Sequence, residues 1–477
     1  MIDKIKRLEK AAGILEPLPD ERKELLQKTI RYSEEFLNGL QTSLTYKSPK
    51  EIRFLNSPIS EDPMNIDEVL ALLKTNVDTA GINPASGGHL GYIPGGGIYQ
   101  SSLGDFLAAV TNRYAGVFFA SPGAVKMENM LLSWMADLVG YPDSCGGNLT
   151  SGGSISNLIA MVTARDAFEI KPSEIERTVV YLTSQAHHST EKALRIAGLK
   201  DCVKHFISMD ANFKMNTSAL EQAVINDKKC GLIPWLIVAS AGTTDVGAVD
   251  PLNDIGDIAA KYNLWYHIDG AYGAFFILSD TGEKILDGLG KSNSIIMDPH
   301  KGLFLPYGSG AVLIKDRNRL YHSHSYQAGY MQDALPDNDE FSPADLSPEL
   351  SKHFRGLRLW LPLKLLGLAP FRAALEEKLQ LARYAYERLN DFVNIEFGPY
   401  PELSVVTFRL IPPSGDANEF NKKLLDEIHK DGRVFLSSTL LNGKFTLRMA
   451  VLSFRTHLHE IDLALEILKE KLEILQR

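Results

Sequence analysis

The stretch WLIVASAGTTDVGAVDPLNDIGDIAAKYNLWYHIDGA (235–271) decides the fold class. Its two ends, WLIVASAG (235–242) and LWYHIDGA (264–271), are rich in apolar, β-branched and aromatic residues, which is typical of buried strands. LNDIGDIAAKY (252–262), between them, has helical periodicity. The same alternation continues on both sides, where further buried strands are predicted at TVVYLTS (178–184), SIIMDPHKG (294–302) and AVLIKD (311–316). Strands that alternate with helices predict an α/β fold with a mainly parallel sheet covered on both faces.

The pattern of predicted helices and strands divides the chain into three parts. Residues 1–77 form a predicted helical arm, because apolar residues recur at helical spacing between Leu26 and Leu40. Residues 78–345 hold the alternating strands and helices, and residues 346–477 are predicted to form a smaller α+β domain. An amphipathic arm of this kind either docks on a second subunit or caps its own, and the pattern does not choose between these two.

Composition and charge argue against several classes of function. The 477 residues include 50 Lys+Arg and 59 Asp+Glu, a net charge of −9, and 44% of them are hydrophobic. An acidic chain without a basic block is a poor candidate for binding nucleic acid or an anionic membrane. The charged start MIDKIKRLEK does not resemble a signal peptide, and no apolar run approaches the roughly 18 residues of a membrane span. Cys145, Cys202 and Cys230 form no CxxC pair, so we expect no metal site and a cytoplasmic location.

Two candidate site residues follow predicted strands. Lys301 ends DPHK (298–301), where a lysine is well placed to form an imine with an aldehyde cofactor, although most lysines are solvated surface residues. Asp269 would be costly to bury without a cation or hydrogen-bond donors, and a protonated pyridine nitrogen would be such a partner. A turn-capping carboxylate is the alternative. Ala271 would face the same side of the strand and could touch a flat ring.

Three further segments offer partners for a phosphorylated aromatic cofactor. TSGGS (150–154) leads into a predicted helix at 155–168, whose N-terminal N–H groups favour an anion such as phosphate; an ordinary Ser-capped helix is the alternative. His187 could stack on an aromatic ring or be a structural loop residue. GTTD (242–245) ends another strand and offers hydroxyl donors at the same sheet edge. Together with Asp269 and Lys301, these are the partners that pyridoxal 5'-phosphate needs, so this cofactor is predicted.

Several motifs are similar to those of one known family. They are SIIMDPHKGLFLPYGSGAVLIKD (294–316), QAHHSTEKA (185–193), HIDGAYGAF (267–275), HLGYIPGGG (89–97) and LRMAVLSFRT (447–456). With them the chain resembles, over nearly its whole length, the group II pyridoxal-phosphate-dependent amino-acid decarboxylases. The resemblance implies the fold type I of pyridoxal-phosphate enzymes. This fold has a mainly parallel seven-stranded sheet flanked by helices, a smaller C-terminal α+β domain and an N-terminal helical arm.

The resemblance also implies a role for individual residues. Lys301 resembles the Schiff-base lysine, and Tyr330 resembles a loop tyrosine that reaches the partner's active site and returns a proton to the product. The implied catalytic residues are Lys301, Tyr330, His187 and His300. The implied cofactor-binding residues are Lys301, Asp269, His187, Thr244, Ala271, Gly153, Ser154 and His300.

The activity implied by the resemblance is decarboxylation of an L-amino acid to the amine and CO2, in a homodimer with shared active sites. FRGLRLWLPLK (354–364) is more similar to the aromatic-amino-acid branch of the family than to the glutamate branch, so an aromatic substrate is favoured. Tyr92, Phe118 and Phe119 are candidates for an aromatic substrate pocket. The alternatives are an acidic substrate, or an aminotransferase, carbon–carbon lyase or aldehyde-forming decarboxylase reaction on the same cofactor.

Overall fold

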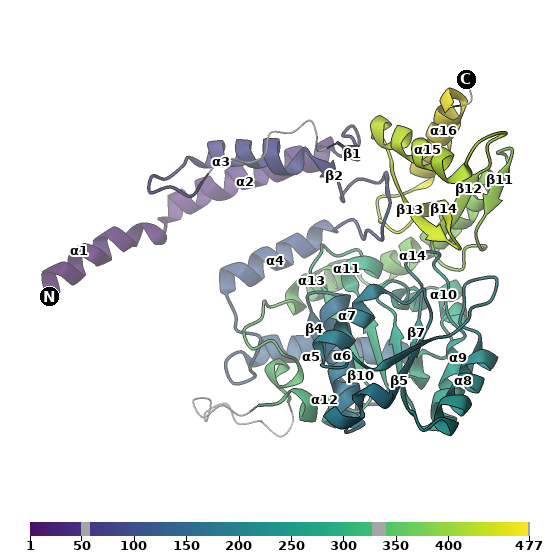
Figure 1. Ribbon diagram of the computed structural model, residues 1–477. Coiled ribbons are helices and arrows are strands. Elements are labelled where there is room, and N and C mark those ends of the chain that lie inside the picture. The colour runs from purple at the N-terminus through teal and green to yellow at the C-terminus, as the bar shows by residue number, and fades with distance from the viewer. Residues whose placement is uncertain (49–57, 327–339, 476–477) are drawn as a thin grey trace.

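The computed structural model describes residues 1–48, 58–326 and 340–475. It shows an α/β body, a smaller sheet with its own helices near the C-terminus, and a helical arm that projects from the body (Figure 1). Among the described residues, no helix is both long enough and apolar enough to cross a bilayer.

The body is built on a seven-stranded sheet in the order β4-β10-β9-β8-β7-β5-β6. Only β10 runs antiparallel to its neighbours, so the predicted mainly parallel sheet is confirmed. The strands are β4 (Gly146–Thr150), β5 (Thr178–Leu182), β6 (Val203–Phe206), β7 (Ile233–Ser240), β8 (Trp265–Asp269), β9 (Ser294–Met297) and β10 (Gly310–Ile314).

Apolar clusters cover the sheet on both faces. Along β7, Ile237 and Ala239 belong to one buried cluster, whereas Leu236 and Val238 belong to another. Because successive side chains of a strand point to opposite faces, each face of the sheet has its own core. The helices of the body are α4 (Tyr99–Thr111), α5 (Pro122–Val139), α6 (Gly153–Ala167), α7 (His188–Ile196), α8 (Thr217–Lys229), α9 (Leu252–Tyr262), α10 (Asp280–Ile285), α11 (Pro299–Gly302), α12 (Arg317–His324) and α13 (Gly356–Leu366).

The second sheet has five strands in the order β11-β12-β14-β13-β3. Its strands are β11 (Ile395–Phe397), β12 (Val405–Leu410), β13 (Phe435–Leu441), β14 (Lys444–Ala450) and β3 (His89–Leu90), and α14 (Ala369–Leu389), α15 (Ala417–Asp431) and α16 (Leu458–Leu475) accompany it. β3 comes from far earlier in the chain and pairs in parallel with β13, His89 opposite Phe435. α13 and α14 follow each other closely in the chain and are divided at Gly367, whose φ is +69°.

The described residues of the N-terminal region, 1–48 and 58–82, include three α-helices and a short strand pair. They are α1 (Ile2–Ala12), α2 (Pro19–Gly39), α3 (Ile66–Leu73), β1 (Tyr46–Lys47) and β2 (Gly81–Ile82). α2 and α3 lie side by side, joined by the ion pair of Lys28 and Asp67 at 2.9 Å (Figure 1). α1 extends furthest from the body and has no buried residue.

Candidate active site

A cavity of about 370 Å³ opens at the carboxyl ends of the parallel strands. The loops that follow β4, β5, β7, β8 and β9 all contribute to it, which is where open α/β sheets bind ligands. Its lining includes eight of the nine predicted site residues, namely Gly153, Ser154, His187, Thr244, Asp269, Ala271, His300 and Lys301. The ninth, Tyr330, lies outside the described residues.

Lys301 stands on the short helix α11, directly after β9. Its Nζ lies 3.1 Å from Asp298 Oδ2, and the Asp298 side chain is only 1% exposed. Asp298 belongs to the DPHK motif, but the sequence indicated no role for it. The ion pair holds the lysine amine at the rim of the cavity, where the side chain remains 25% exposed.

Asp269 is the last residue of β8 and is buried. Its Oδ2 accepts a hydrogen bond from Asn157 Nδ2 over 3.1 Å, and its Oδ1 accepts one from the backbone N–H of Ala271 over 3.2 Å. Both donors are neutral, and no lysine or arginine of the described chain pairs with this carboxylate. A buried carboxylate of this kind fits a cationic group in the cavity, such as a protonated ring nitrogen.

The glycine-rich loop before α6 lies tightly against the strand ends. Gly152 has a φ of +149°, which L side chains rarely adopt, and a Cβ there would lie 3.2 Å from His300 Cε1. A Cβ on Gly153 would lie 3.1 Å from Asp298 Oδ2. The glycines therefore let the N-terminus of α6 approach the cavity, and that 15-residue helix favours an anion there.

Two histidines border the cavity. His187 caps α7, because its Nδ1 accepts the backbone N–H of Ser189 over 3.3 Å. His300 Nδ1 lies 2.5 Å from the carbonyl oxygen of Ser309. Burial lowers the pKa of both imidazoles, so both rings are neutral near pH 7.

The loop carrying Thr244 is tied to the C-terminal sheet. Arg448 Nε, on β14, donates to the carbonyl oxygen of Thr244 over 2.8 Å. The cavity-lining Tyr272 accepts the backbone N–H of Ser404 over 2.9 Å. The C-terminal sheet and the residue directly before its strand β12 therefore hold two segments of the cavity in place.

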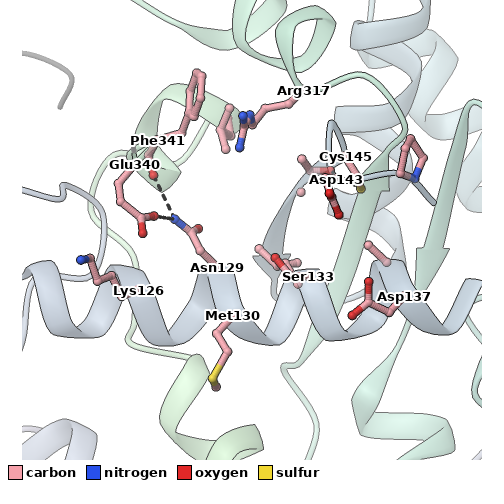
Figure 2. A pocket seen from close by; sticks show the side chains of 16 residues that line it. Lys126, Asn129, Met130, Ser133, Asp137, Asp143, Cys145, Arg317, Glu340 and Phe341 are labelled. Atoms are coloured by element: carbon pink, nitrogen blue, oxygen red, sulfur yellow. Dashed lines mark hydrogen bonds between the residues drawn. The ribbon is translucent and has the colours of Figure 1, made fainter. Parts of the chain in front are cut away.

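A second cavity of about 400 Å³ lies between α5, β4 and the segment that begins at Glu340 (Figure 2). Figure 2 shows the amide of Asn129 donating to the Glu340 carboxylate, over 2.7 Å, and to the Phe341 carbonyl oxygen. None of the predicted site residues lines it. The chemistry therefore belongs to the cavity at the strand ends.

An anion site at a helix N-terminus, a buried carboxylate without a protein cation, and a lysine at the end of a strand together fit pyridoxal phosphate. On this fold, they define a pyridoxal-phosphate-dependent enzyme of fold type I. The chain belongs to the pyridoxal-dependent decarboxylase family, whose conserved-domain model matches residues 49–411. It is a carboxy-lyase, and its cofactor is pyridoxal phosphate.

Individual proteins of the family are similar over most of the chain. An aromatic-L-amino-acid decarboxylase of Bacillus atrophaeus is 34% identical over 412 residues, 85% of each chain. A phenylacetaldehyde synthase of Petunia hybrida is 28% identical over 87% of this chain and 86% of its own. The crystal structure of Oryza sativa TDC with PLP and tryptamine has a TM-score of 0.89 at 24% identity, covering 97% of this chain and all of that one, which confirms the fold.

Proposed function

We propose that the enzyme decarboxylates an aromatic L-amino acid to the corresponding amine and CO2. The observation that carries this proposal is an apolar cavity of about 530 Å³ that shares His300 with the cofactor cavity. Phe36, Leu37, Leu305 and Tyr307 are among its lining residues. An apolar cavity beside the reacting centre favours a substrate with a large apolar side chain.

The charged groups of this cavity disfavour an acidic substrate. The cation Arg455 already donates to the carbonyl oxygens of Ala85 and Gly96, over 3.2 and 2.6 Å. Asp78, which also lines the cavity, would repel a second carboxylate. The described residues that line the cavity therefore include one acidic and one basic side chain, Asp78 and Arg455, and give it no excess of positive charge.

The aromatic side chains suggested by the sequence do not line this cavity. Tyr92 is 59% exposed and Phe119 is 70% exposed, while Phe118 lies under Lys126 on α5. The aromatic lining comes instead from Tyr32, Phe36 and other side chains that the sequence did not single out. An aromatic-L-amino-acid decarboxylase among the relatives supports the same substrate class.

Each site residue has a proposed role in the reaction. When bound, pyridoxal phosphate supplies the electron-withdrawing ring that stabilises the charge left as CO2 departs. Asp269 would keep the proton on the ring nitrogen, His187 would stack on the ring, and Lys301 would hold the cofactor covalently. The first residues of α6, Gly153 and Ser154, would hold the phosphate.

Further roles are proposed around the ring and at the substrate's Cα. Thr244 and Ala271 would contact the ring, and His300 would lie near the phosphate and the reacting centre. The Tyr330 phenol would give its proton to Cα of the product. Without that donor an aldehyde becomes the competing product, and a relative named phenylacetaldehyde synthase makes this the second candidate function.

The test is CO2 release from a panel of the common amino acids by the purified holoenzyme. Phenylalanine, tyrosine or tryptophan should react fastest, and glutamate and aspartate should react at least 100 times more slowly. Counting amine, aldehyde and peroxide with the best substrate distinguishes the two products. Fastest turnover of an acidic amino acid would refute the proposed substrate class.

We also propose that the enzyme is a cytoplasmic homodimer with shared active sites. Ile2, Ile5 and Leu8 form one apolar side of α1, and each is more than half exposed in the single chain. A helix that projects from the body with such a face gains stability by covering a second subunit. Light scattering that found an active monomer would refute this.

A further inference from the structure

A single buried amide joins the two side chains proposed to hold the cofactor ring. Asn157 lies on α6, close after Ser154, and is fully buried. Its Nδ2 donates to Asp269 Oδ2 over 3.1 Å and to Ser189 Oγ over 2.9 Å. Its Oδ1 lies 2.9 Å from Nε2 of His267 on β8. Both N–H groups and the carbonyl oxygen of this amide are therefore engaged.

The carboxylate of Asp269 fixes the direction of the hydrogen bonds on one side. A carboxylate only accepts, so it faces the NH2 group of Asn157, and the amide oxygen faces His267. That oxygen also only accepts, so His267 Nε2 carries the proton. Burial lowers the pKa of His267 to about 4, so the ring is neutral and its Nδ1 accepts from Ser294 Oγ over 2.8 Å. Ser294 Oγ in turn accepts the indole N–H of Trp265 over 2.9 Å.

The second branch of the network ends at His187. The Asn157 amide occupies a lone pair of Ser189 Oγ, which leaves the hydroxyl proton for His187 Nδ1, 2.6 Å away. The backbone N–H of Ser189 points to the same nitrogen. His187 Nδ1 therefore accepts, and in the neutral ring the proton is on Nε2. Within the described chain Nε2 has no hydrogen-bond partner, and His187 lines the cofactor cavity.

We propose that Asn157 is a positioning residue that sets the direction of the hydrogen bonds around the cofactor. It keeps Asp269 an acceptor toward the ring nitrogen, and it keeps His187 in the tautomer whose Nε2–H is available to the cavity. The inference rests on the roles proposed for Asp269 and His187. It adds that one amide, which faces neither substrate nor solvent, controls both.

Neutron diffraction of the wild-type holoenzyme after exchange into D2O tests the network directly. Deuterium should lie on Nε2 of His187 and of His267, and neither Nδ1 atom should carry one. The deuterated amide nitrogen of Asn157 should face Asp269. Deuterium on His187 Nδ1 with a bare Nε2, or a reversed amide, would overturn the inference. This readout does not depend on the substrate, so an error in the proposed activity would not change it.

The second test measures cofactor affinity in solution. Asn157→Leu keeps the approximate volume and removes a donor to a charged group, so the dissociation constant of pyridoxal phosphate from the apoenzyme should rise roughly 10- to 100-fold. Thr163→Val is the matched control, because Thr163 is also buried on α6 but donates to the Ile159 carbonyl oxygen over 2.9 Å, away from the cavity. Its dissociation constant should stay within about twofold of wild type. An unchanged constant in folded Asn157→Leu, or an equal rise in Thr163→Val, would overturn the proposal; if Asn157→Leu does not fold, the neutron result decides.

Discussion

Replacing Asp269 with asparagine should separate the chemical role of this carboxylate from its structural one. Both of its oxygens accept N–H groups, from Asn157 and from Ala271. In either orientation, an asparagine at position 269 would turn its own NH2 group toward one of these two N–H donors, and that donor would lose its acceptor. Leaving a buried donor unpaired costs about 1 to 3 kcal/mol of stability.

The loss of the charge should cost more than the loss of the hydrogen bond. Removing one partner of a buried charge pair costs about 3 to 5 kcal/mol. If Asp269 pairs with the protonated ring nitrogen, that energy corresponds to a roughly 150- to 5,000-fold fall in kcat/KM. The assay is CO2 release by the Asp269→Asn enzyme at saturating pyridoxal phosphate, with the best substrate of the amino-acid panel.

Asp250 provides a control that shows how much of the fall in kcat/KM comes from the loss of a buried, hydrogen-bonded carboxylate alone. It is also a buried carboxylate whose two oxygens accept N–H groups, here the backbones of Met215 and Ser240, each over 2.8 Å. It does not line the cavity. Asp250→Asn should lose similar stability but keep kcat/KM within a few-fold of wild type. If Asp269→Asn stays within tenfold of wild type, or if both variants lose the same activity, the reasoning about the ring nitrogen is refuted.

Four further predictions concern separate features of the molecule. Borohydride reduction followed by peptide mapping should place the cofactor on Lys301, and label on another lysine would refute its role. Tyr330→Phe should bind the cofactor normally but lower amine formation roughly 100- to 10,000-fold, with aldehyde and peroxide appearing in its place; unchanged amine output would exclude Tyr330 as the donor. Burial lowers the pKa of His89 to about 4, below its unfolded value near 6.5, so its contribution to stability is complete above pH 6.5 and is lost as the pH falls. Urea unfolding at pH 6.5 and pH 5 should show a loss of up to about 2 kcal/mol from this group, and His89→Phe should remove that share; an identical pH dependence in the variant would contradict it. Ile5→Asp combined with Leu8→Asp should shift a dimer toward monomer in light scattering, and an unchanged mass would show that α1 is not in the interface.

The strands that the sequence predicted are those in the middle of the sheet. Every residue of β8 is buried, so its sequence is continuously apolar or aromatic up to Asp269. The sequence pattern did not mark β4 or β6. β4 begins with two glycines, which are rare in strands. β6 lies at the edge of the sheet and has no fully buried residue, so its sequence VKHF lacks the apolar run that marks a buried strand.

The sequence predicted the site residues that follow strands. It did not predict the residues whose role depends on contacts with distant parts of the chain or on the direction of a side chain. Lys301 and Asp269 stand at strand ends, which a linear pattern can reveal. Asn157 looks like any polar residue of an amphipathic helix, because its partner Asp269 lies more than 100 positions away in the sequence. The acidic partner of Lys301, Asp298, is only three positions away, but nothing in the pattern shows that it points back to the lysine.

The pairing of β3 with β13 has a consequence for how the enzyme is made. On the ribosome, His89 and Leu90 leave the exit tunnel long before Phe435 and Leu436 are translated. β3 therefore stays unpaired until β13 has been made. The seven-stranded sheet can close once β10 has emerged. The loop of Thr244, however, is held by Arg448, which is translated 204 residues later. The cavity therefore gains this support only after β14 has been translated, and a chain that stops before β14 would carry the lysine and the carboxylate without it.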